Sequence, residues 1–143
     1  MDGKQGGPRL RGGSIADAEL SEAILQDASF EGVLMYGADL SYSDLSGSVF
    51  YIVLALGANF RGANLQKVQF LGGSYENVDF RDADLRGAIF DADSVGGAVD
   101  LSGADLSGAK IDGATFRSVH YSESTKFPVG FEPDPSGFEK EWS

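Results

Sequence analysis

Cysteine is absent from this 143-residue chain, which excludes disulfide bonds, thiolate nucleophiles and cysteine-ligated zinc or iron–sulfur sites. No stretch approaches the roughly 20 consecutive apolar residues of a membrane-spanning helix. The segment from Met1 to Arg11 is polar and glycine-rich and contains no hydrophobic signal segment. These absences predict a cytoplasmic protein, or a lumenal or periplasmic one if a presequence has been removed.

Catalytic motifs are scarce as well. The single histidine, His120, has no zinc-type partner nearby in the sequence. The glycine-rich stretches lack the phosphate-binding pattern G-x-x-x-x-G-K-S/T, and neither GxSxG nor HExxH occurs. We therefore expect a noncatalytic protein that uses no cofactor and no metal ion.

What the chain does have is a period of five. From Leu10 to Val95 every fifth residue is apolar, and the residue two places before it is almost always small. After one extra residue the period resumes at Leu101 and continues to Tyr121. Five residues match neither the helical turn of about 3.6 residues nor the two-residue alternation of a flat strand. The chain is therefore a repeat array.

The repeats are most explicit at Ala38-Asp39-Leu40, Ala58-Asn59-Phe60, Ala63-Asn64-Leu65, Ala83-Asp84-Leu85 and Ala104-Asp105-Leu106. These A(D/N)LXX units resemble those of the pentapeptide repeat family over roughly residues 8–121. The resemblance implies an all-β fold, a right-handed quadrilateral β-helix with one pentapeptide per side and four per coil. Central residues and the small residues two before them would point inward, while the other three positions face water. The central positions are enough for nearly six coils.

Two segments flank the repeats. We expect residues 1–7 to form a mobile N-terminal arm, residues 8–121 the β-helix, and residues 122–143 a C-terminal cap or tail. The string T-K-F-P-x-G-F-x-P resembles the closing segment of cyanobacterial members of the family, and it places Phe127 and Phe131 over the final coil. An open solenoid end needs such a cover because it exposes the core of the last coil.

The period is interrupted once, and we predict a one-residue bulge near residues 96–100, where glycines tolerate unusual backbone angles. On this register Leu101 stacks on Phe80. Asp93 then occupies an inward small-residue position just before the bulge. A buried carboxylate must be hydrogen-bonded or paired, so we expect the corner to supply donors; the alternative is a coil that opens to water.

One run breaks the polar character of the outward positions. Residues 49–56 are apolar throughout, although only Phe50, Val53 and Ala55 should point inward. Together with neighbouring coils, this run would expose on the order of 500 Å² of apolar surface, more than a monomer usually shows without reason. We call the predicted set the apolar patch: Leu34, Tyr36, Val49, Tyr51, Ile52, Leu54, Leu56, Leu71 and Ile89.

We interpret the apolar patch as a protein-binding surface. The favoured function is that of a rigid rod that binds a protein partner or a second copy of itself, with anchors centred on Tyr51 and Leu54. Alternatively, the arm or the tail folds over the patch. Neither membrane binding nor direct nucleic-acid binding is expected of this chain, whose net charge is −11.

The negative charge supports an alternative function. Some pentapeptide repeat proteins inhibit DNA gyrase as acidic DNA mimics, and the resemblance extends that function to this chain as an inhibitor of gyrase or topoisomerase. The rod would carry one charge per about 3 Å, whereas duplex DNA carries one per about 1.7 Å, so this alternative is the less favoured one. The predicted acidic face contains Glu19, Glu22, Asp39, Asp79, Asp82 and Asp100.

Overall fold

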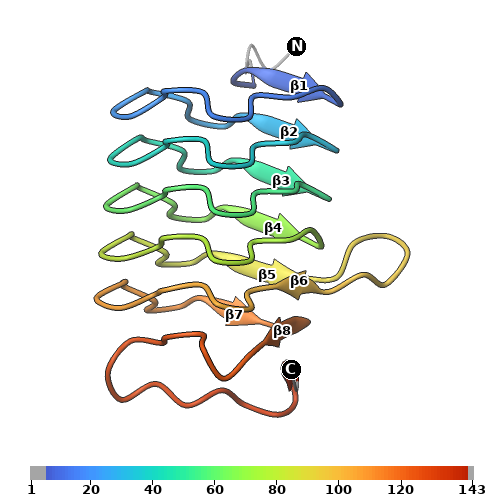
Figure 1. Ribbon diagram of the computed structural model, residues 1–143, viewed down its shortest axis with the longest axis vertical. Coiled ribbons are helices and arrows are strands. Elements are labelled where there is room, and N and C mark those ends of the chain that lie inside the picture. Colours follow the sequence, from blue (N-terminus) through green and yellow to red (C-terminus); the bar gives the residue numbers. More distant parts are fainter. Residues whose placement is uncertain (1–5, 142–143) are drawn as a thin grey trace.

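The computed structural model describes residues 6–141 and shows a rod of stacked coils (Figure 1). Residues 1–5 of the predicted arm and residues 142–143 of the predicted tail lie outside this range. Six strands form one parallel sheet: β1 (Arg9–Arg11), β2 (Ser29–Glu31), β3 (Val49–Tyr51), β4 (Gln69–Leu71), β5 (Ile89–Asp91) and β7 (Thr115–Phe116). A second parallel sheet contains β6 (Val99–Asp100), β8 (Val119–Tyr121) and β9 (Phe138–Lys140). The described residues include no helix, and the predicted all-β solenoid is confirmed.

Each coil turns through four sides because one residue of every repeat bends the backbone. Leu10 pairs with Phe30 of the next coil, so a regular coil spans 20 residues. At the corners, the residue two places after the central one has a positive φ, which glycine adopts without strain, as at Gly37 (φ 63°). Hydrogen bonds join successive coils; for example, the amide of Leu20 donates to the carbonyl oxygen of Asp39 (2.7 Å).

Inward side chains stack into buried columns along the rod. The ring centroids of consecutive phenylalanines are 4.9, 5.3 and 4.6 Å apart in the column Phe30, Phe50, Phe70 and Phe90. A second column, fully shielded from solvent, contains Leu45, Leu65 and Leu85. Alanines occupy many of the small inward positions, so large and small side chains fill the narrow interior together. The predicted inward positions of these phenylalanines and leucines are confirmed.

The predicted bulge lies at the right place, but its size is wrong. Ser74 pairs with Asp100 instead of with residue 94, so the coil that begins at β5 contains six extra residues. They produce a loop, residues 92–98, that projects from one corner of the rod (Figure 1). Val95, which the period places inside the rod, is 87 % exposed on this loop. Insertions of one residue and of six residues differ by five residues, which is one full side of the coil. Both leave the later repeats in the same phase, so the five-residue period does not distinguish them.

Because the loop holds five more residues than the predicted bulge, every later residue lies one side of the rod away from its predicted side. Leu101 belongs to the column of Tyr75 and does not stack on Phe80. The phenylalanine column continues from Phe90 to Phe116, whose ring centroids lie 4.9 Å apart. The core remains closed beyond the loop because each shifted position is again occupied by an apolar residue.

Asp93 closes the loop instead of entering the core. Its Oδ1 accepts hydrogen bonds from the backbone amides of Val95 and Gly97, both at 2.9 Å. The predicted inward position of Asp93 is therefore wrong, whereas its predicted hydrogen bonding to the corner is confirmed. The hydroxyl of Ser94 contacts the hydroxyl of Tyr51, which fastens the loop to the coil of β3.

Phe127 and Phe131 cover the end of the rod, as predicted. The Phe131 ring lies 5.6 Å from that of Phe116, and the Phe127 ring lies 5.5 Å from that of Tyr121. This final segment also extends the solenoid, because β9 pairs with β8 and adds a further level to the second sheet. Phe138 of β9 packs against both covering rings, at 5.6 and 5.7 Å.

Candidate protein-binding surface

Two neighbouring sides of the rod carry the apolar patch. The strand face contains β1 to β5 and β7, and the adjacent face follows it in each coil after one corner. Coils are counted from the one that begins at β1. On the adjacent face, Leu34 of the second coil pairs in register with Leu54 of the third. Tyr36 and Leu56 lie two residues further along the same two coils, so four large apolar side chains share this face.

The strand face carries Val49, Tyr51, Leu71 and Ile89, and Ile52 lies at the corner between the two faces. Leu71 of β4 is in register with Tyr51 of β3. Ile89 is separated from Val49 by Gln69, which lies between them in the sheet. The structure therefore brings the predicted patch residues together, apart from Ile89.

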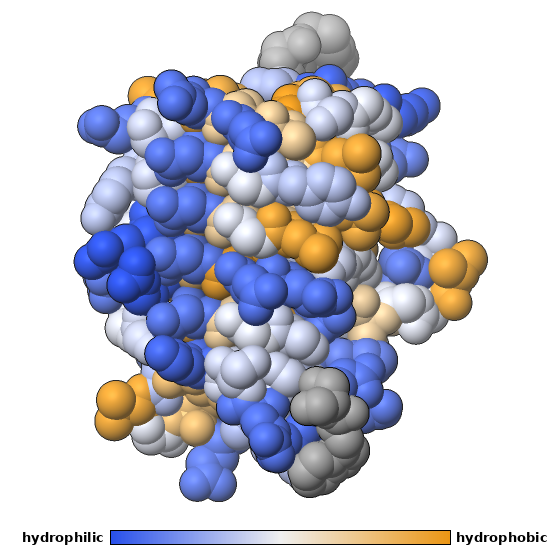
Figure 2. Space-filling model, viewed as in Figure 1, coloured by the Kyte–Doolittle hydropathy of each residue, from blue (hydrophilic) through white to orange (hydrophobic). Residues whose placement is uncertain are grey.

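The patch is accessible to solvent. Tyr36 is 40 % exposed and Ile52 is 37 % exposed, and the remaining members are half-buried. Apolar surface gathers on the upper part of the face seen in Figure 2, towards the side from which the loop projects. The fourth coil has Ser74 and Glu76 at the positions that correspond to Leu54 and Leu56. The fold therefore does not require large apolar side chains on the adjacent face.

Ile52 lies at the corner between the two faces with φ 50°. This is the left-handed region, in which a β-branched side chain is strained. The equivalent corners of neighbouring coils are Gly12, Gly32 and Gly72, with φ of 69°, 64° and 63°. Glycine meets the backbone requirement of this corner without that strain. The repeat pattern placed Ile52 on the surface, and glycine at the same position of neighbouring coils was the sequence signal for its positive φ.

The loop borders the patch. The backbone amide of Ser94 donates to the hydroxyl oxygen of Tyr51 (3.2 Å), so one side of this predicted anchor is in contact with the loop. Val95 adds an exposed apolar side chain beyond the corner. Residues 122–141 lie at the opposite end of the rod (Figure 1), so the alternative in which the tail covers the patch is wrong for those residues.

Other exposed apolar side chains, which sequence reasoning did not single out, lie apart from the patch. Ile24 and Tyr42, 78 % and 60 % exposed, belong to the two remaining sides of the rod. The Tyr42 ring lies over Gly62 of the next coil. Val129 is exposed in the final segment. None of these positions joins a second apolar residue in the way that Leu34 joins Leu54.

The predicted acidic face needs one correction. Asp100 pairs with Ser74 and therefore lies on the adjacent face, because the loop shifts the register. Asp105 takes the place predicted for Asp100, in register with Asp79. The acidic face keeps its other five predicted members, which are Glu19, Glu22, Asp39, Asp79 and Asp82.

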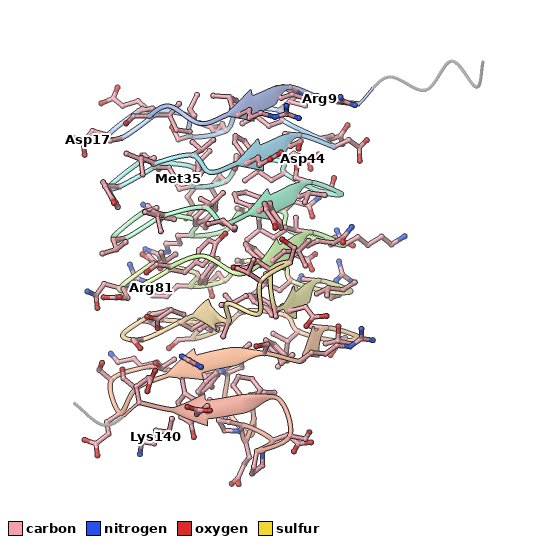
Figure 3. All side chains as sticks on the ribbon, turned by 90° about the vertical axis from the view of Figure 1, so that its right-hand side faces the viewer. Arg9, Asp17, Met35, Asp44, Arg81 and Lys140 are labelled. Carbon is pink, nitrogen blue, oxygen red and sulfur yellow. The ribbon has the colours of Figure 1, made fainter. Side chains whose placement is uncertain are left out.

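The recurrent aspartate or asparagine before the central residue has a structural role. Asp39 Oδ1 accepts hydrogen bonds from the hydroxyl and the amide of Ser41, at 2.6 and 3.0 Å, and these bonds lower the pKa of Asp39. Burial acts to raise the pKa of Asp79, but the hydrogen bonds and positive charge of Arg81 outweigh it and lower that pKa. Arg81 projects from the rod, whereas Met35 lies inside it (Figure 3). Much of the acidic charge is thus tied to the backbone or to arginine.

The chemistry of the described surface is that of noncovalent contact. No group of three or more histidine, cysteine, aspartate or glutamate side chains in residues 6–141 is arranged to hold a metal ion. Within the same range, no helix is long and apolar enough to cross a membrane. His120 lies beside β9, with its Nδ1 2.9 Å from Glu141 Oε1.

Two family models match the chain. The model described as the pentapeptide repeat region matches residues 23–99, and the model of pentapeptide repeats in eight copies matches residues 98–120. No curated protein matches the sequence significantly.

Several solved structures are similar to this chain. Rfr23, a pentapeptide repeat protein of the cyanobacterium Cyanothece 51142, is 17 % identical over 85 % of both chains, with a TM-score of 0.47. The pentapeptide repeat protein alr5209 of Nostoc PCC 7120 is 28 % identical over 90 % of this chain and 80 % of its own, with a TM-score of 0.27. QnrB1, a plasmid-mediated fluoroquinolone resistance protein, is 21 % identical in a trypsin-treated form, over 91 % and 72 % of the two chains, with a TM-score of 0.34.

Proposed function

The chain belongs to the pentapeptide repeat family, and we propose that it is a noncatalytic interaction module that binds a protein partner through the apolar patch. The solenoid holds the outward side chains in fixed register, so the patch is preorganised for binding. Tyr51 and Leu54 are the anchors, one on each side of the corner at Ile52.

The observation that carries the proposal is the positive φ of the exposed residue Ile52. A left-handed backbone costs an L-residue roughly 1–2 kcal/mol, and glycine would avoid that cost, as it does in neighbouring coils. The strained isoleucine is 37 % exposed and lies at the centre of the patch. Seven other described corner residues that are not glycine also have a positive φ, but Ile52 is the only β-branched one among them. A strained, exposed isoleucine at the centre of the patch supports a role in binding.

A double variant tests this proposal. Tyr51→Lys combined with Leu54→Glu replaces two outward apolar anchors with charges and should leave the core intact, because both side chains point away from it. Affinity capture from a lysate of the producing organism should recover partner proteins with the wild type and lose them with the double variant. Ile24→Glu is the matched control, since it introduces a charge at an exposed apolar residue on another face. Equal recovery by the wild type and the folded double variant would contradict the proposal.

The DNA-mimic alternative has less support. Asp79 is paired with Arg81 (2.8 Å), and Asp82 lies 3.9 Å from Arg61, so arginines offset part of the acidic face. Asp100 also leaves that face for the adjacent one. A supercoiling assay with purified gyrase separates the two functions, because inhibition at micromolar protein is expected of a mimic and not of the interaction module.

A further inference from the structure

We infer that the partner bound at the adjacent face is a second copy of this chain, arranged antiparallel to the first. The inference rests on the proposed function, because it names the ligand of part of the same surface. The contact is centred on the four apolar side chains of the second and third coils, here called the interface quartet: Leu34, Tyr36, Leu54 and Leu56.

The quartet is complementary to itself. A two-fold interface brings the same patch of both copies together. With the axis perpendicular to the rod and midway between the second and third coils, Leu34 faces Leu54 of the second copy. The same rotation places Tyr36 opposite Leu56 of the second copy. The quartet therefore meets another quartet in two apolar layers, each of which contains one residue from each coil.

The positions that flank the quartet place no two like charges directly opposite each other. The same axis sets the first coil of one copy against the fourth coil of the other, so Ser14 faces Ser74. Glu76 then faces Ala16, and Asp17 faces the neutral amide of Asn77. A chain with a net charge of −11 can associate with itself only where its charges do not oppose one another. The adjacent face satisfies that condition in its first four coils.

The loop also has room in this arrangement. It leaves the fifth coil and extends towards the N-terminal coils, where it contacts Tyr51 at the corner where the adjacent face begins. The two-fold axis sets this stretch of the corner beside the start of the rod in the second copy. The corner residues there are Gly12 and Gly13, and neither has another atom near the place where a side chain would stand. Val95 therefore extends the apolar contact without a steric clash.

The predicted dimer is weak and strengthened by salt. The contact uses only the part of the apolar patch that lies on the adjacent face, so it should bury less than about 1,200 Å² in total, an area typical of transient association. Outside the contact, both copies carry the remaining negative charge, and salt screens this repulsion. We expect the dissociation constant to fall several-fold when the ionic strength is raised. Binding carried by ion pairs would show the opposite trend.

Crosslinking tests the arrangement directly, because the chain contains no cysteine of its own. Ser14→Cys and Ser74→Cys leave the quartet intact. In the proposed dimer these two positions face each other at the roughly 10 Å separation of packed sheets. Two copies of the same variant would have their cysteines offset along the rod by three coils, about 14 Å. A short thiol-specific crosslinker should therefore join a mixture of the two variants and leave either variant alone uncrosslinked.

The controls separate this inference from the proposed function. Ser21→Cys, exposed on the acidic face, should not crosslink with either variant. Adding Leu56→Glu should abolish the crosslink in the mixture. Equal crosslinking of the single variants would overturn the antiparallel arrangement. A wild type that stays monomeric at all concentrations and salt levels would overturn self-association, while patch-dependent capture of another protein would still support the proposed function.

Discussion

Replacing Phe70 by alanine should remove a large part of the stability of the rod. Phe70 has no solvent exposure and lies in the middle of the phenylalanine column. Its ring centroid is 5.3 Å from that of Phe50 and 4.6 Å from that of Phe90, and the Tyr75 ring meets it edge-on at 5.3 Å. The coils on both sides hold their backbones in register, so the cavity cannot collapse easily.

The expected loss follows from this environment. Phe→Ala in a rigid core costs about 3–5 kcal/mol, and we expect Phe70→Ala to lie near the middle of this range, at about 4 kcal/mol. A domain of this size has a stability of about 5–15 kcal/mol, so the variant should unfold at much lower denaturant. Urea unfolding followed by circular dichroism measures the difference. Phe70→Leu is the matched control and should lose clearly less stability than Phe70→Ala, because it leaves a smaller cavity. A loss below about 1 kcal/mol for Phe70→Ala would refute the packing described for this column.

Two further predictions concern a buried hydroxyl and a surface carboxylate. The hydroxyl of Tyr75 is buried without a hydrogen-bond partner, and burial raises its pKa well above the ordinary range; Tyr75→Phe should be neutral or stabilise by up to about 1 kcal/mol, and a clear loss in urea unfolding would contradict this. The hydrogen bonds of Arg86 lower the pKa of Asp84 in the folded state. The stabilising contribution of that carboxylate is therefore present above the unfolded pKa of about 3.9 and lost as the pH falls through the folded value. The stability difference between wild type and Asp84→Asn should accordingly vanish in acid, and a difference that stays constant from neutral to acidic pH would show that the charge of Asp84 contributes nothing.

The solenoid could be predicted from the sequence because its rule is local. A large apolar residue every five positions and a small one two places before it determine which side chains enter the core, and Phe30, Phe50 and Phe70 are buried as expected. The cover formed by Phe127 and Phe131 was also recognisable, from an aromatic segment that follows the last repeat. Each of these features depends on residues close together in the chain.

The remaining features depend on contacts between coils. The period cannot show that Val95 leaves the rod, and this ambiguity moved Asp100 onto the wrong face. The missing partner of the Tyr75 hydroxyl follows from the way coils stack, which the linear pattern does not contain. The strand β9 was missed because its pairing with β8 follows a proline-containing segment that no longer obeys the five-residue period.

Self-association through the apolar patch is tested most directly by the mass of the protein in solution, measured by sedimentation over a wide range of concentration. The wild type should shift from the 15.1 kDa monomer towards a dimer as its concentration and the salt concentration rise. The Tyr51→Lys/Leu54→Glu variant should remain a folded monomer throughout. Identical masses for the two proteins at every concentration would contradict binding of a second copy through this patch.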